Sequence, residues 1–208
     1  MTEKKKTRIK IRNEEKILEA ALKLFSSYGF HGTTMEKIAE LADMSQPNLH
    51  NYFKTKADLY KTVLNNTLEI WLDPLNHLDI AGNPEVELRR YIGKKIEMAR
   101  KYPEASRIFA AEMLQGAPIL MHHLKGPVRM KVKTFSTVIE SWSRQGKIRE
   151  VDPVHLIFMI WAATQHYADF LPQIRAVMDV ARLNKSHYDA AAESISSIII
   201  GGLLPVAK

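Results

Sequence analysis

Three side chains recur at one-turn intervals in the C-terminal half of the sequence. Trp161, Gln165 and Asp169 are spaced i, i+4 and i+8, which places them on one stripe of an α-helix. An indole ring offers a flat stacking surface, and a glutamine amide beside it both donates and accepts hydrogen bonds. A planar heterocycle with an amide or imide edge would satisfy both groups. The alternative is that Trp161 is core and Gln165 is an interface amide.

Trp71 is the candidate for another wall of the same pocket, because it lies near the end of a predicted helix that begins at Lys56. Cavities between bundle helices, mostly apolar with a few polar groups, are common ligand sites. Trp71 has the same alternative, a plain core position. His166 and Tyr167 receive no chemical role and are expected to line the pocket or an interface.

A second polar group lies on one face of a short predicted helix that Ser45 caps. Leu49 and Phe53 are expected to face inward, with Ile38 and Ala39 of the preceding helix. The free face carries three amides, which can pair bidentately with adenine in the major groove of DNA. Its other members can reach base edges, phosphates or a thymine methyl group. The face consists of Gln46, Pro47, Asn48, His50, Asn51 and Tyr52.

Positive charge follows and precedes this face. Lys54 and Lys56 come directly after it, and Lys56 is predicted to hold a phosphate with the N–H groups of the fourth helix's first turn. Residues 1–12 hold six lysines or arginines and one glutamate, whereas residues 13–62 carry a net charge of −1. Such an arm suits an anionic polymer or a membrane surface, or is a solubilising tail.

The elements that must position these groups are all helices, because the sequence has no sustained period-two alternation. An all-α fold of about nine helices is predicted. The first helix is expected to open at Asn13 and close at Gly29. Thr33 and Glu36 are expected to form a capping box for the second helix, and the fourth should end at Pro74.

Beyond the fourth helix, prolines mark expected helix starts, since their missing N–H costs nothing there. These are Pro84, Pro103 and Pro153, and the expected breaks are Gly116, Gly126-Pro127 and Gly146. The helix from Pro153 to about Leu171 and a last helix over about residues 186–200 are the most apolar pair. They are predicted to form a four-helix bundle across a twofold axis.

The composition excludes several classes of protein. The chain has no cysteine, which excludes disulfides and thiolate metal sites and agrees with a cytoplasmic protein. Its longest apolar run, over residues 154–164, is shorter than the ~20 residues a bilayer requires. The pairs His122-His123 and His155/His166 lack the i, i+4 spacing of helical metal ligands, so no metal is expected. Phosphate loops, nucleophile elbows and paired carboxylates are absent from the sequence, so neither an enzyme nor a cofactor is predicted.

The run ILEAALKLFSSYGFHGTTMEKIAELADMSQPNLHNYFKTKADLYKTVL, over residues 17–64, resembles the DNA-binding domain of the TetR family of bacterial repressors. The resemblance implies a homodimer whose two recognition helices read the half-sites of a palindromic operator. Carried over by position, the DNA-facing residues would be Thr34, Gln46, Pro47, Asn48, His50, Asn51, Tyr52 and Lys56.

A second resemblance covers RKYPEASRIFAAEMLQGAP, IWLDPL and DPVHLIFMIWAATQHYADF, over residues 100–118, 70–75 and 152–170. These segments look like the sensing domain of the pyrimidine-utilisation regulators, a uracil-responsive branch of the TetR family. The resemblance implies a ligand pocket that uses Trp71, Trp161 and Gln165, and it makes uracil or thymine the first effectors to test.

The sequence therefore predicts a basic arm over residues 1–12, a helix-turn-helix DNA-binding domain over residues 13–62, and a ligand-binding and dimerisation domain over residues 63–208. The predicted function is a ligand-responsive transcriptional repressor that releases its operator when a small planar effector binds. The alternative is a DNA-binding architectural or partner-recruiting protein without a small-molecule effector.

Overall fold

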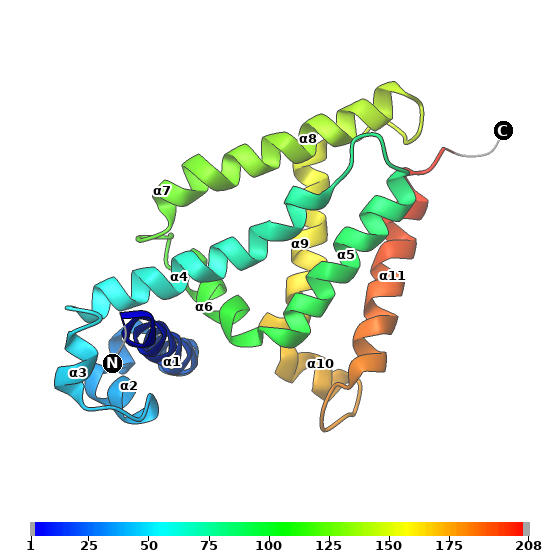
Figure 1. The fold of residues 1–208 in the computed structure, drawn as a ribbon. Coiled ribbons are helices and arrows are strands. Elements are labelled where there is room, and N and C mark those ends of the chain that lie inside the picture. Colours follow the sequence, from blue (N-terminus) through cyan, green and yellow to red (C-terminus); the bar gives the residue numbers. More distant parts are fainter. Residues whose placement is uncertain (1–2, 206–208) are drawn as a thin grey trace. The chain divides into compact units, whose positions relative to one another are not determined.

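The computed structural model describes residues 3–205, with side chains from Arg8 onward. The described residues form helices and no strands, which confirms the all-α prediction. They divide into two compact units. The first unit runs up to Leu68 and includes Arg107–Leu120, and the second unit comprises Glu69–Ser106 and the chain from Met121 onward. Two of the three boundaries fall inside helices, α4 (Lys56–Leu72) and α6 (Pro103–Leu114), which are labelled in Figure 1.

Helix α1 (Glu3–Gly32) begins ten residues before the predicted start at Asn13, so that prediction is wrong. Lysine and arginine are good helix formers, and the basic run extends the helix backwards. Met1 and Thr2 of the predicted arm lie outside the described residues, as do the side chains of residues 3–7. Gly29 interrupts the helix with φ 68°, which confirms the predicted stop, since a left-handed φ favours glycine.

The two short helices of the first unit are α2 (Met35–Leu41) and α3 (Gln46–His50). The predicted capping box at Thr33 is wrong. The N-cap of α2 is Thr34, whose hydroxyl accepts from the Lys37 N–H at 3.2 Å, while the buried Thr33 hydroxyl donates to the Gly29 carbonyl. Ser45 caps α3 as predicted, accepting from the Asn48 N–H at 3.4 Å. The residues expected to face inward, Ile38, Ala39, Leu49 and Phe53, are all buried.

An aromatic cluster and a buried carboxylate bind the last part of α6 into the first unit. The Tyr60 ring meets Phe25 and Phe30 edge-on, with centroids 4.9 and 5.1 Å away. Its hydroxyl lies 3.5 Å from the Glu112 carboxylate, which also accepts from the backbone N–H groups of residues 119 and 120. Burial, with Glu112 nearby, raises the pKa of Tyr60 to about 12. Residues 107–120, which were assigned to the larger domain, therefore group with the first unit.

In the second unit, each helix expected to begin at a proline does so. Its elements besides the ends of α4 and α6 are η1 (Asp73–His77), α5 (Pro84–Lys101), α7 (Met121–His123), η2 (Leu124–Val128), α8 (Arg129–Arg144), α9 (Pro153–Asp169), α10 (Leu171–Val177) and α11 (Lys185–Leu203).

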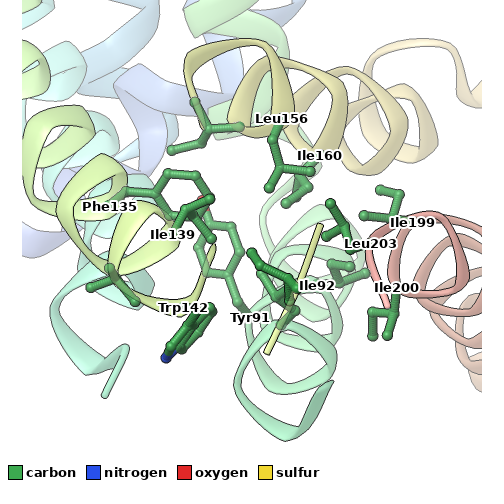
Figure 2. Packing of buried hydrophobic residues seen from close by; sticks show 14 of the residues in the cluster. Tyr91, Ile92, Phe135, Ile139, Trp142, Leu156, Ile160, Ile199, Ile200 and Leu203 are labelled. Carbon is green, nitrogen blue, oxygen red and sulfur yellow. The ribbon is translucent and has the colours of Figure 1, made fainter. Parts of the chain in front are cut away.

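The core of the second unit lies where α5, α8, α9 and α11 meet, as Figure 2 shows. Trp142 is fully buried in it, and its indole N–H donates to the Ile80 carbonyl at 2.9 Å. The break expected at Gly126-Pro127 is wrong, because both residues lie in η2, a π-helical turn continuous with α8. A π turn accommodates the ring and missing N–H of a proline without ending the helix. The breaks at Gly116 and Gly146 are confirmed by φ values of 87° and 69°.

Candidate functional site

The face of α3 that was predicted to meet DNA is open to solvent at its two ends. Gln46, Pro47 and Asn51 are exposed, and Asn48 and His50 are half-buried. The helix itself ends at His50, so Asn51 is its C-cap and Tyr52 lies in the turn that follows. The Tyr52 hydroxyl accepts a hydrogen bond from the Asn13 amide at 3.0 Å. Thr34 is exposed at the start of α2 but uses its hydroxyl as the N-cap.

Lys56 is placed differently from the expectation that it holds a phosphate. Its Nζ donates to the Phe30 and Thr33 carbonyls at 2.7 and 2.8 Å, and lies 4.4 Å from the centroid of the Phe30 ring. Two of its three N–H donors are thus occupied in joining the start of α4 to the end of α1. Sequence reasoning missed this structural role. Lys54, two residues earlier, is exposed.

The three predicted ligand residues lie on α4 and α9 in the second unit, and both tryptophans contact α5. The Trp161 indole N–H donates to the Tyr91 hydroxyl at 2.8 Å, which ties α9 to α5. Trp71 is buried against Met98 of α5 and Ala168 of α9. Gln165 is half-buried on α9, one turn beyond Trp161.

Lys95 of α5 is the charged residue of this region that the sequence reasoning missed. It is 2% exposed, and its Nζ lies 3.9 Å from the centroid of the Trp71 ring. Burial lowers its pKa to about 7, and the charge of Asp169 on α9 opposes part of that shift. The Asp169 carboxylate in turn accepts a hydrogen bond from the Ser106 hydroxyl. Gln165 therefore lies along α9 one turn after Trp161, which bonds to Tyr91, and one turn before Asp169, whose charge acts on Lys95.

A signal for Lys95 was present in the sequence. Helix α5 buries Leu88, Ile92, Ile96 and Ala99, and this apolar stripe predicts one face of an amphipathic helix. Lys95 falls in that stripe, where a charged side chain is expensive to bury. A lysine at a core position is therefore a reason to look for a function.

An open groove of about 560 Å3 lies next to the predicted ligand residues but contains none of them. It runs between η1 and α5, and two of its walls, Tyr91 and Met98, are the same side chains that pack against Trp161 and Trp71. Burial raises the pKa of Tyr91 far above its usual range, so its hydroxyl stays protonated and able to donate.

In the part of the chain that the structure describes, no group of three histidine, aspartate or glutamate side chains is arranged to hold a metal ion. Between residues 3 and 205, none of the helices has the length and apolar character needed to cross a bilayer.

The contacting short helices α2 and α3, in a chain that has a second helical unit, define a helix-turn-helix regulator, and comparisons with known sequences identify the family. The family described as "Bacterial regulatory proteins, tetR family" matches residues 17–63, and "YcdC-like protein, C-terminal region" matches residues 64–206. The chain belongs to the TetR family and is a transcriptional regulator, not an enzyme.

Two curated relatives cover much of the chain. The HTH-type transcriptional regulator RutR of Escherichia coli K12 is 45% identical over 201 residues, which is 97% of this chain and 95% of RutR. The HTH-type transcriptional repressor NicS of Pseudomonas putida KT2440 is 32% identical over 161 residues, or 75% of this chain and 76% of NicS.

Solved structures share the fold at lower identity. AibR in complex with isovaleryl coenzyme A and operator DNA has a TM-score of 0.69 and 22% identity, over 89% of this chain and 97% of that one. A tetR-family regulatory protein from Rhodococcus RHA1 has a TM-score of 0.75 and 17% identity, over 94% and 98% of the two chains. At these identities the likeness concerns the fold.

Proposed function

We propose that the chain is a cytoplasmic repressor that binds a palindromic operator as a homodimer and releases it when a small planar effector binds. The observation that carries the proposal is the 45% identity to RutR over nearly the whole of both chains, which spans the sensing unit as well as the DNA-binding unit. The resemblance of residues 152–170 to the pyrimidine-utilisation regulators makes uracil or thymine the effector class.

The α3 face supports the DNA-binding half of this proposal. Gln46 at the start of α3 and Asn51 at its C-cap are exposed amides. Amides are suited to bidentate pairing with adenine. Lys54 and the arm supply positive charge that positions the backbone contacts without reading sequence.

Asparagine-to-alanine changes on this face are expected to relax sequence preference. Asn48→Ala or Asn51→Ala should each cost about 1–3 kcal/mol toward the selected operator, because each removes a bidentate base contact. Affinity for random DNA should change little. The measurement is fluorescence anisotropy on a fragment selected from random DNA and on a scrambled fragment. Asn66→Ala, an exposed asparagine on α4, is the matched control. Unchanged operator affinity in both variants would refute the groove assignment.

Gln165 supports the sensing half, because it is a half-buried amide on α9, one turn beyond Trp161. Replacing Gln165 with leucine keeps the size of the side chain and removes both donor and acceptor. Uracil binding should weaken at least about tenfold, since a polar edge of the ligand loses its partners. Isothermal calorimetry with uracil and thymine measures it, with Gln173→Leu on α10 as the exposed control.

A second candidate function is a DNA-binding architectural protein without an effector. One observation favours it: the face of Trp71 is covered by Lys95 of the same chain. The calorimetric experiment separates the two. If titration with uracil or thymine gives a heat of binding and the protein releases its operator, the result supports the repressor. If the protein binds operator and responds to neither pyrimidine, the result supports the architectural role.

A further inference from the structure

Burying a lysine against a tryptophan ring costs free energy. An ammonium group loses its hydration when it is buried, and a packed apolar side chain of similar volume is often at least as stable. The hydrogen bond found for the Lys95 Nζ in the described part of the chain goes to the Trp71 carbonyl and is 3.5 Å long. The fold itself therefore gains little from Lys95.

The groups around Lys95 are rich in hydrogen-bond donors. Trp71 is only 5% exposed, and its buried indole N–H has no hydrogen-bond partner. One turn before Lys95, the Tyr91 hydroxyl accepts from Trp161 and keeps its own O–H to donate. A ligand that satisfies these groups must bring acceptors, and carbonyl oxygens on a flat ring match the two indoles beside them.

We propose that Lys95 is the effector-binding cation of the sensing unit, donating to a carbonyl oxygen of a planar heterocycle that carries at least two carbonyl acceptors. This inference rests on the proposed function and adds the chemical class that the site selects. Gln165 then reads an N–H beside the carbonyl, and Tyr91 and the Trp71 indole are placed to reach the remaining acceptors. A ring without carbonyl groups leaves these donors unpaired and is rejected.

Effector binding should be coupled to proton uptake by Lys95. The charged side chain facing Lys95 is Asp169 of α9, which Ser106 of α6 hydrogen-bonds; α4 contributes the Trp71 ring and carbonyl, and α5 itself the Tyr91 hydroxyl. Because burial lowers the pKa of Lys95 to about 7, much of the free protein is neutral there at pH 8.5. A carbonyl acceptor stabilises the ammonium form, so the complex takes up a proton at pH 8.5 and little at pH 6.

The test is calorimetry with uracil at pH 6 and pH 8.5, each in two buffers of different ionisation enthalpy. In the wild-type protein affinity should be several-fold higher at pH 6, with proton uptake at pH 8.5. Lys95→Met should weaken binding at least tenfold, abolish the uptake and leave the melting temperature equal or higher. Lys94→Met, which removes an exposed lysine paired with Glu97, is the matched control and should keep wild-type binding.

Binding of uracil by Lys95→Met within threefold of wild type, or proton uptake that survives the change, overturns the proposal while leaving the effector site intact. If Lys95→Met does not fold, Lys95→Gln takes its place; its binding should be weakened and independent of pH. A wild-type protein that binds operator but neither uracil nor thymine overturns the role of Lys95 and the pyrimidine effector together. In that case the DNA-binding half of the proposed function, measured separately, still stands.

Discussion

Lys56→Met is expected to destabilise the first unit by about 2–4 kcal/mol, because hydrogen bonds from a charged donor contribute about 1.5–3 kcal/mol and a cation–π contact adds to them. The Phe30 and Thr33 carbonyls would lose their common donor, because a methionine side chain has no hydrogen-bond donor. These carbonyls end α1 and lead into α2, so the loss should loosen the junction that sets α2 and α3.

Chemical denaturation followed by circular dichroism measures this loss, and the salt dependence of DNA binding tests the alternative. A lysine that neutralises one phosphate changes the slope of log affinity against log salt by about 0.9. For Lys56→Met the slope should stay near the wild-type value, since its ammonium is engaged within the unit.

Lys54→Met is the matched control, because Lys54 is exposed and two residues away. It should leave the free energy of unfolding unchanged and reduce the slope of log affinity against log salt by about 0.9, the value for one phosphate contact. A Lys56→Met protein of wild-type stability with a reduced salt slope would instead make Lys56 the phosphate contact that the sequence suggested.

Local signals in the sequence predicted most helix ends, whereas packing decided which threonine caps α2. The prolines at positions 84, 103 and 153 act through their own missing N–H, so their helices could be read directly. Thr33 and Thr34 are adjacent and chemically identical. Which of them caps α2 depends on which is buried, and burial is set by packing with Gly29 rather than by the local sequence.

The candidate sites divide in the same way. The inward and outward faces of α3 follow from its periodicity, so Leu49 and the exposed amides were predictable. The partners of Lys56 and Lys95 were not, because they lie on other segments of the chain, at least 23 residues away. From the sequence alone, a lysine is expected to be exposed on the surface. Only the fold shows that Lys56 contacts the Phe30 ring and that Lys95 contacts the Trp71 ring.

The exposed face of α9 and α11 leads to the prediction with the largest effect on function. The two helices contact each other and both pack against α5. Their outer surface keeps Phe158, Met159 and Ile198 exposed by 51, 58 and 75%. Exposed apolar side chains on two adjacent helices favour a contact with a second copy, in which the same face meets itself across a twofold axis. The dimer proposed for operator binding would bury this face.

Phe158→Glu should therefore convert the protein into a monomer at micromolar concentration and lower operator affinity at least about a hundredfold. The symmetry of such an interface introduces the charge twice, and each carboxylate is buried without a partner. A monomer also reads a single half-site and loses the gain from linking two binding modules. Sedimentation velocity and anisotropy on a full operator and on one half-site measure the two effects.

Val177→Glu on α10 is the control, since Val177 is 80% exposed and lies on neither α9 nor α11. It adds the same charge to an apolar surface position and should leave both the assembly and operator affinity at wild-type values. The affinity of Phe158→Glu for a single half-site should also persist, because α3 is in the other unit. A variant that remains dimeric would place the interface elsewhere on the chain, whereas a monomer with full operator affinity would show that the dimer is not required for DNA binding.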